Sequence, residues 1–480
     1  MDDPSSDNPE SPITSDDLQA CGMTPGRAFG VALREAPIAQ AMLGRERTLA
    51  EIRAVVADPT APAGHPHFAD VAALLTAAIE QPPATFTERD EPAPWASWCD
   101  APEEGALQQM NNAMRIPSAV RGALMPDAHR GYGLPIGGVL ATEGTVIPYA
   151  VGVDIACRMK LTVLDLDPET IETDPRRLEQ ALLKRTQFGV GSKLAVRDRP
   201  DHDVLDPDKW EFSRLTHGLR DKAWEQLGTS GSGNHFVEFG KLTLDEPDLG
   251  LAPGTYLAVM SHSGSRGPGA QIASFYSKRA RELHPELPKE LSHLAWLDLD
   301  SDDGRAYWQS MELMGEFASA SHAVIHERVR DFLGAQVLAS VENHHNYAWL
   351  EEHDGKQLVV HRKGATPAGD GVLGVIPGSM ATPAFIVRGR GSSKSLLSAS
   401  HGAGRVMSRT AAKQQFTWKQ VKPRLDAAGV RLLAAGIDEN PFVYKDINEV
   451  MGQQQDLVKV VARFDPRIVR MADAGERPED

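Results

Sequence analysis

Short β-branched runs separated by glycine-rich turns limit the fold of this chain more than any other pattern in it. The runs lie between about Trp95 and Met471 and read GGVLAT, LTVLDL, TYLAVMSHSG, LVVHRKG and AFIVRGRG. Such runs are typical of strands. Helical patterns occur among them, notably at 178–186 and 305–334, without regular strand–helix alternation or an internal repeat. The sequence therefore predicts an α+β fold with a strand-rich core rather than a doubly wound sheet.

The first 90 residues have a different character. Residues 1–13 are acidic and rich in proline and serine, so we expect a disordered tail there. A helical pattern begins at Thr14 or Ser15, continues through GRAFGVALREA, starts again at Thr48, and ends with FADVAALLTAAIEQ before a proline pair. We expect a helical extension over 14–90, a main domain over 91–471 and a flexible tail over 472–480.

Composition narrows the class of protein. No stretch reaches the roughly 18 consecutive apolar residues of a membrane span, and the N-terminus lacks an apolar leader pattern. Three cysteines in 480 residues do not make a disulfide framework, so a functional cysteine would be a reduced thiol or a metal ligand. These features predict a cytoplasmic protein without disulfides or a membrane partner.

The charge distribution matters more than its sum. A net charge of −16 argues against nucleic acid, because lysine and arginine make the phosphate contacts. From Gly371 to Arg424, however, there are nine basic residues and no acid. This stretch is either a solvated basic face or a local site for phosphate groups.

Five side chains form a candidate metal-binding set. Asp154 and Cys157 lie three residues apart in VGVDIACRM, and His235, His262 and His345 lie beside Gly, Asn or Ser at apparent strand ends. A single such cysteine is more often buried core, and a single such histidine is more often structural. Together, a carboxylate, a thiolate and imidazoles suit divalent metals such as Mn, Zn or Co.

The segment SASHGAGRVMSRTAAK combines His401 with a glycine-rich turn and two arginines. If 403–413 is helical, Arg405 and Arg409 lie on one face, and the backbone N–H groups at its start can hold phosphate oxygens. No acid is nearby in the sequence. An imidazole in this setting can act as a nucleophile or as an acid or base at phosphorus.

The other histidines carry weaker signals. His322 and His326 are four residues apart on a predicted helix, which mimics a metal pair, but we expect a solvated or capping role because charged residues flank them. His129 in MPDAHRGYG either contacts substrate or braces a turn.

The ordered motifs resemble those of one family. MPDAHRGYGLPIGG, VGVDIACRM, GSGNHFVE, SHSGSRG, HHNYAW, HRKGA, IPGSMATPAFIVRG, SHGAGRVMSR and VYKDI together resemble the RtcB-type RNA-splicing ligases across 95–471. The resemblance implies an unusual α+β fold. It also implies an enzyme that uses GTP and Mn²⁺ to join RNA 3'-phosphate or 2',3'-cyclic phosphate ends to 5'-hydroxyl ends, in tRNA splicing or RNA repair.

The resemblance also implies roles for individual residues. Cys157 would bridge two Mn²⁺ ions, with Asp154 and His235 at one and His262 and His345 at the other, and Zn²⁺ could replace Mn²⁺ on purification. His401 would take GMP from GTP as a phosphoramidate. GTP or GMP would be bound by Asn234, Glu238, Ser379, Ala403, Tyr444 and Arg470. The RNA end or its phosphate would be bound by Arg266, Lys363, Arg405 and Arg409.

Several positions depart from the family pattern. Ala156 and Arg158 flank Cys157 where the family usually has glycines, which predicts a crowded or recharged metal loop. Arg470 and Met471 stand where the family commonly ends in Lys-Gly, and arginine is not equivalent to lysine. The remaining departures are Ser230, Ser232 and Ala384.

Alternatives stay open. A metal-dependent guanylyltransferase that caps nucleic-acid 3'-phosphate ends without ligation would use the same metal residues and His401. A degenerate RNA-binding protein would have lost some of them, and all are present. The N-terminal region loosely resembles a helical element of the RNA-binding end of tRNA nucleotidyltransferases, or is a helical cap on the main domain. An activating protein partner is also compatible with the resemblance.

Overall fold

The computed structural model describes residues 11–23, 27–61, 64–80 and 86–477. The chain divides into two compact units, one of residues 1–86 with 284–286 and one of 87–283 with 287–480. The sequence placed this boundary near residue 90, within the same proline-rich segment 81–95.

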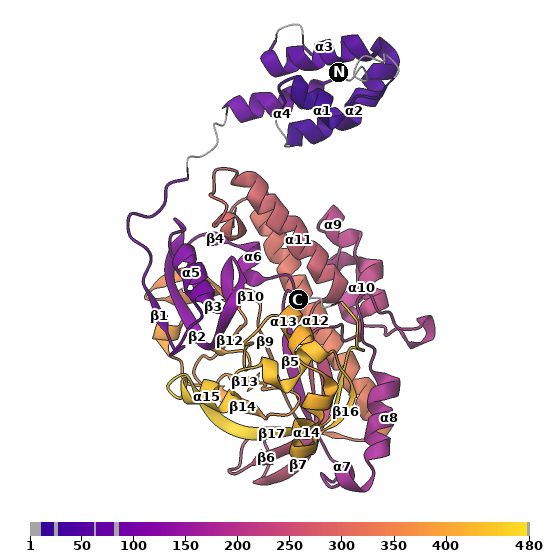
Figure 1. Ribbon diagram of the computed structural model, residues 1–480, viewed down its shortest axis with the longest axis vertical. Helices are drawn as coiled ribbons and strands as arrows, with labels where there is room; N and C mark the ends of the chain where they lie inside the picture. The colour runs from indigo at the N-terminus through magenta and orange to yellow at the C-terminus, as the bar shows by residue number, and fades with distance from the viewer. Residues whose placement is uncertain (1–10, 24–26, 62–63, 81–85, 478–480) are drawn as a thin grey trace. The chain divides into compact units, whose positions relative to one another are not determined.

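Four helices make up the first unit: α1 (Ser15–Ala20), α2 (Arg27–Leu43), α3 (Arg45–Ala57) and α4 (Ala69–Glu80) (Figure 1). α1 begins with a capping box, in which Thr14 and Asp17 each accept a hydrogen bond from the other's backbone N–H. The apolar faces of the helices bury a core that includes Leu18, Ala32 and Ile52. The unit therefore has a hydrophobic core of its own.

The expected disordered tail over 1–13 is wrong at its end. Ile13 is buried, and its N–H donates to Gln40 Oε1 at 3.1 Å. Gln40 Nε2 donates in turn to the carbonyl of Ser11 at 2.9 Å. One side chain on α2 therefore fixes the chain that leads into α1. Residues 1–10 lie outside the described residues.

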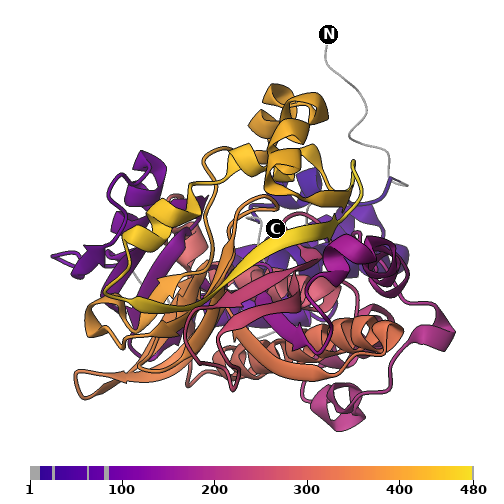
Figure 2. The same ribbon diagram turned by 90° about the horizontal axis from the view of Figure 1, so that it is seen from below.

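The core of the second unit is an eight-stranded sheet with the order β13-β14-β17-β6-β7-β5-β9, in which β16 also pairs with β17. The strands are β5 (Arg158–Leu164), β6 (Phe236–Leu244), β7 (Gly254–Ser263), β9 (Val337–His344), β13 (Leu373–Ile376), β14 (Ala384–Gly389), β16 (Arg431–Ala434) and β17 (Val458–Met471). All pairs except β16 with β17 are antiparallel. Figure 2 shows β17 as a long strand that sweeps across this sheet.

The sheet curls so that its two edge strands meet. The Asn343 amide on β9 accepts from the Val375 N–H of β13 at 2.9 Å and donates toward the Val375 carbonyl. Met159, Met260, Ile386 and Phe464 fill the inside of the curl. This side-chain bridge brings the edges of an open sheet together, as in a nearly closed barrel.

A second sheet has five strands in the order β1-β2-β3-β11-β10. They are β1 (Trp95–Ser97), β2 (Ala119–Tyr132), β3 (Leu134–Thr142), β10 (Tyr347–His353) and β11 (Lys356–Lys363). Two short pairs join β12 (Ala365–Pro367) to β15 (Ser398–Ser400) and β4 (Thr145–Val146) to β8 (Leu297–Asp298). The five runs recognised in the sequence lie in or overlap β3, β5, β7, β11 and β14, which confirms the α+β class.

Helices of the second unit are α5 (Glu104–Ala113), α6 (Pro148–Val151), α7 (Thr170–Thr173), α8 (Pro175–Arg185), α9 (Arg214–His217), α10 (Arg220–Gln226), α11 (Arg266–Leu283), α12 (Asp302–Leu333), α13 (Arg409–Gln415), α14 (Trp418–Ala428) and α15 (Ile447–Gly452). Figure 1 shows α12 beside α11. Leu178 of α8 and Ile325 of α12 pack with Phe239 and Val259 on the outer face of the large sheet. α8 and α12 therefore cover that face.

Two further features bear on the sequence predictions. Of the expected flexible tail over 472–480, the structure describes 472–477, where the Ser232 hydroxyl donates to the carbonyl of Arg477 at 2.6 Å. Residues 478–480 lie outside the described residues. Among the described helices, none has the length and apolar character that crossing a membrane requires.

Candidate active site

Five side chains converge where four neighbouring strands of the large sheet end. Cys157 precedes β5, His235 precedes β6, His262 lies near the end of β7, and His345 follows β9. Antiparallel pairing of β6, β7, β5 and β9 brings these ends together, with Phe236 opposite His262 and Arg158 opposite His344. Asp154, in the turn before Cys157, completes the set.

The atoms are close enough to share metal ions. Cys157 Sγ lies 3.1 Å from His262 Nε2 and 3.5 Å from His235 Nε2. His235 Nε2 is 3.1 Å from Asp154 Oδ2, and His262 Nε2 is 3.1 Å from His345 Nε2. Two groups with ligand spacing result, Asp154–Cys157–His235 and Cys157–His262–His345. These are the two sets that the family resemblance implied.

The protonation of the imidazoles fits the binding of a cation. Burial lowers the pKa of His262 to about 3 and holds the pKa of His345 well below its usual value, so both rings are neutral. His262 Nδ1 donates to the Asn234 carbonyl at 3.1 Å, which leaves the lone pair on Nε2. Neutral nitrogens, one thiol and one carboxylate suit Mn²⁺ or Zn²⁺.

The two departures beside Cys157 have different consequences. Ala156 has φ of 56°, the left-handed conformation that a glycine adopts without strain. The guanidinium of Arg158 makes an ion pair with Glu342 and donates to the Gly315 carbonyl at 3.1 Å. The expectation of a recharged metal loop is therefore wrong, because Glu342 neutralises the added charge.

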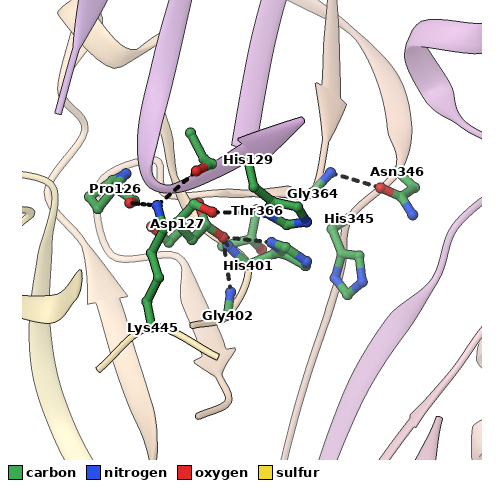
Figure 3. Close-up of polar contacts among 12 residues, drawn as sticks. Pro126, Asp127, His129, His345, Asn346, Gly364, Thr366, His401, Gly402 and Lys445 are labelled. Carbon is green, nitrogen blue, oxygen red and sulfur yellow. Dashed lines mark hydrogen bonds and ion pairs between the residues drawn. The ribbon is translucent and has the colours of Figure 1, made fainter. Parts of the chain in front are cut away.

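His401 lies beside the metal-binding set with one ring nitrogen engaged (Figure 3). Its Nδ1 is 2.7 Å from Asp127 Oδ2, and the same oxygen accepts from the backbone N–H groups of His401 and Gly402. The rings of His401 and His345 are 4.9 Å apart. Because the carboxylate holds the proton on Nδ1, Nε2 keeps its lone pair.

Asp127 is the residue that sequence reasoning missed, because it is close to His401 in space but 274 residues away in the sequence. Its side chain is fully buried. Lys445 Nζ donates to the carbonyls of Pro126 and Ala128 and so fixes the backbone on both sides of Asp127 (Figure 3). The sequence did contain one signal of a buried acid, because the charged Asp127 interrupts an apolar run in LMPDAHR.

His129 lines the same cavity as His401, which is compatible with the predicted contact to substrate. Its Nδ1 is 3.1 Å from the Asp127 carbonyl. Burial lowers the pKa of His129 to about 4. The ring is therefore neutral and also braces the turn, as the second reading expected.

The cavity of about 670 Å³ joins His401 to the metal-binding set. This volume is within the range of sites for small ligands. Its wall includes five of the six residues expected to bind GTP, which are Asn234, Glu238, Ser379, Ala403 and Tyr444. Asn234 Oδ1 is buried without a hydrogen-bond partner among the described residues. Such an atom is suited to a ligand donor.

Glu238 is a buried acid in this wall whose pKa is strongly shifted. Burial alone raises the pKa of its carboxyl to about 8, so the side chain is protonated at neutral pH. The cost of ionising it falls when a ligand supplies hydrogen-bond donors.

Arg470, the sixth expected GTP residue, lies on the other face of the sheet. Pairing of β17 with β6 sets Val469 opposite Glu238 and Arg470 opposite Val237. Val469 and Met471 line the cavity. Because side chains alternate along a strand, Arg470 points away and donates to the carbonyls of Leu182, Leu183 and Thr186. The prediction that Arg470 binds GTP is therefore wrong.

Arg405 and Arg409 line the cavity, but acids neutralise them. Arg405 pairs with Glu439 at 3.4 Å, and Arg409 pairs with Asp438 and Glu439. Residues 403–408 are not helical, since α13 begins at Arg409. The acid-free stretch in the sequence thus meets its acids from another segment. The Tyr444 hydroxyl donates to the same Glu439.

Arg266 and Lys363 are not in the cavity wall. Arg266 is buried and donates to Thr229 Oγ1 and the Gly189 carbonyl, both at 3.1 Å. Lys363 donates to the carbonyls of Tyr132 at 2.6 Å and Tyr149 at 2.9 Å. Both side chains therefore hold backbone rather than face the cavity.

His322 and His326 have neither a solvated nor a capping role, contrary to expectation. Both are buried on α12, and both contact Ser261 Oγ at 2.7 Å. Ser261 immediately precedes His262, so the pair packs behind a member of the metal-binding set.

Comparisons with known proteins agree on one family. The model of the family described as tRNA-splicing ligase RtcB matches residues 109–472. RNA-splicing ligase RtcB of Escherichia coli K12 is 35% identical over 393 residues, 75% of this chain and 92% of that protein. tRNA-splicing ligase RtcB of Thermococcus kodakarensis is 31% identical, covering 76% and 90%, and RNA-splicing ligase RtcB of Mycobacterium bovis is 32% identical, covering 75% and 98%. Every residue that lines the cavity except Glu103 is inside the matched region, and the chain belongs to the tRNA-splicing ligase RtcB family.

Proposed function

We propose that this protein is a GTP- and Mn²⁺-dependent RNA ligase of the cytoplasm. It joins RNA ends that carry a 3'-phosphate or 2',3'-cyclic phosphate to 5'-hydroxyl ends, in tRNA splicing or RNA repair. The observation that carries the proposal is the pairing of His401 Nδ1 with buried Asp127 at 2.7 Å, beside a ring that belongs to the metal-binding set. This arrangement prepares one nitrogen for attack on phosphorus.

The chain's own groups account for the first step. His401 Nε2 attacks the α-phosphorus of GTP, a P–N bond forms, and pyrophosphate leaves with the electrons of the broken P–O bond. Asp127 stabilises the positive charge that develops on the imidazole. Mn²⁺ held by the two sets of ligands that share Cys157 would act as a Lewis acid toward the phosphate oxygens.

The later steps exchange the guanylate. An oxygen of the RNA 3'-phosphate attacks the guanylate phosphorus and displaces His401. A 5'-hydroxyl then attacks the activated 3'-phosphorus, and GMP leaves. Glu238 suits guanine, because a carboxylate accepts from the N1–H and amino donors that adenine does not present together.

Two measurements test the proposal. The intact mass after incubation with GTP and Mn²⁺ should rise by one guanylate, and His401→Ala should show no rise. Ligation is then measured with RNAs that carry 3'-phosphate and 5'-hydroxyl ends, and with RNAs that carry 3'-hydroxyl and 5'-phosphate ends. Joining of only the second pair contradicts the proposal. Guanylylated 3' ends without joining would instead support the guanylyltransferase alternative.

A further inference from the structure

The tip of the β2–β3 hairpin, Gly131–Tyr132–Gly133, is held from three sides. The Gln109 amide both accepts from the Gly131 N–H at 2.9 Å and donates to the Gly131 carbonyl at 2.6 Å. Lys363 Nζ donates to the Tyr132 carbonyl at 2.6 Å. A Cβ on Gly133, which has φ of 70°, would come within 2.9 Å of the His293 carbonyl. The backbone of the turn is therefore fixed.

The ring that this turn carries is nevertheless exposed. Tyr132 has 67% of its surface accessible although it is a large aromatic residue, and it lines the cavity that contains His401. Tyr149 of α6 and His293 support it at centroid distances of 6.4 Å and 6.1 Å, with interplanar angles of 82° and 70°. The two supporting rings thus meet Tyr132 edge to face.

Two basic side chains lie close to the rings that support Tyr132. Lys363 Nζ lies 5.0 Å from the centroid of Tyr149, and burial lowers the pKa of Lys363 to about 7. Arg281 is the second cation that acts on both Tyr149 and His293. An aromatic face next to basic groups is the usual platform for single-stranded nucleic acid.

We propose that the Tyr132 ring stacks on the nucleobase of an RNA nucleotide at the junction to be joined. The inference rests on the proposed ligase function, because the RNA end must reach His401 through this cavity. The stacked base belongs to the RNA and is distinct from the guanine of GTP, which is proposed to bind Glu238. A rigid, exposed ring lowers the entropy cost of positioning the base.

The test uses full-length protein and RNA ends that carry 2-aminopurine, whose fluorescence is quenched when it stacks. One arm places the probe at the 3'-terminal nucleotide of the 3'-phosphate strand, and the other at the first nucleotide of the 5'-hydroxyl strand. Quenching by wild type and Tyr132→Phe, with loss in Tyr132→Leu, is the expected result in one arm. The arm that responds identifies which strand is stacked.

Steady-state kinetics give the second readout. Tyr132→Leu keeps apolar bulk without a π face and should raise the KM for RNA about tenfold, with a smaller change in kcat. Phe275→Ala removes an exposed aromatic residue outside the cavity wall and serves as the matched control, with unchanged KM. Equal quenching and KM for wild type and Tyr132→Leu would overturn the platform.

The same samples separate this inference from the proposed function. If wild-type protein forms no guanylate on His401 with GTP and Mn²⁺, the proposed function fails. If guanylate forms and Tyr132→Leu raises only the KM for GTP, the ring serves the nucleotide cofactor, and the platform for RNA is wrong.

Discussion

Asp127 determines which nitrogen of His401 can react, because its carboxylate occupies the other one. Three N–H groups converge on a single oxygen of this buried side chain, one from the ring and two from the backbone. The carboxylate therefore has two separable effects: it orients the imidazole, and it supplies a negative charge.

Two substitutions should separate these effects. Asp127→Asn keeps an oxygen for the three donors but removes the charge, so guanylylation of His401 should slow about 10- to 100-fold. Asp127→Ala also leaves the backbone donors unpaired, which costs about 1–3 kcal/mol per group, and should slow guanylylation further and lower the melting temperature. The rates are read from intact mass over time. Equal rates for wild type and Asp127→Asn would contradict a role for the charge.

Glu238 should make GTP binding depend on pH. Guanine donors require the ionised carboxylate, whereas the free side chain with its pKa of about 8 is protonated at neutral pH. Binding must then displace a proton, so affinity should rise by up to about tenfold per pH unit from pH 6 toward 8 and level off above. Calorimetry in buffers of different ionisation enthalpy measures the released proton. Glu238→Gln should bind more weakly with a flat profile.

The sequence predicted that the candidate metal ligands come together, but it did not predict the partner of His401. Each of Cys157, His235, His262 and His345 stands at the end of its own strand pattern, and antiparallel neighbours place such ends together. Asp127 is 274 residues from His401, and no local pattern joins them. The buried acid was therefore visible in the sequence, while its target was not.

At the scale of elements, β7 and α12 are joined by a directed chain of hydrogen bonds. His322 Nε2 lies 3.1 Å from the Ser263 carbonyl and must donate, so its Nδ1 accepts from the Ser261 hydroxyl. Ser261 Oγ accepts from His326 Nε2, and His326 Nδ1 accepts from Thr162. Burial keeps the pKa of both histidines far below the usual value, which fits neutral rings.

Removing the centre of this chain should be costly. Ser261→Ala leaves one buried donor and one buried acceptor unpaired, so we expect a loss of about 2–4 kcal/mol in the free energy of unfolding. Because Ser261 adjoins His262, the affinity for Mn²⁺ should also fall, by about 10-fold. Ser340→Ala, which removes an exposed hydroxyl on β9, is the control. Denaturant unfolding and metal titration measure both effects. A change no larger than that of the control would refute the network.

The positions of the helices and strands could largely be predicted from the sequence. Which way individual side chains point from them could not. Alternation and turn signals located the strands, and Thr14 marked the start of α1. The sequence could not show that Arg470 turns toward α8, because that depends on the register of β17 against β6. It also could not show that Asp438 and Glu439 meet Arg405 and Arg409, since the paired residues are 29 to 34 residues apart in the sequence.

At the scale of the molecule, the metal-binding set ties together the ends of β5, β6, β7 and β9. A ligand that binds only the folded state raises stability in proportion to the logarithm of its concentration, by about 2.7 kcal/mol at 100 times its Kd. Mn²⁺ should therefore raise the melting temperature, and a chelator should reverse the change. Cys157→Ala should abolish the shift, because both groups share that sulfur. A full shift in this variant would show that the ions bind elsewhere.

The basic stretch between residues 371 and 424 is partly neutralised in the folded molecule by acids from other segments. Of the nine basic residues between 371 and 424, Arg388, Arg405, Arg409 and Lys413 are each paired with an acid. The stretch is thus less positive in space than in the sequence. The proposed RNA binding would therefore rely on a smaller set of unpaired cations than the sequence suggested, together with the proposed aromatic platform.

The two faces of β17 limit how the length of this chain can change. Val469 and Met471 border the cavity, while Arg470 between them is anchored to carbonyls at the C-terminal end of α8. Inserting or deleting one residue before this triplet would exchange the two faces, placing a guanidinium in the cavity and apolar side chains against carbonyls. Two-residue changes would preserve the parity. Natural variation in length should therefore gather in the turns, where no such parity applies.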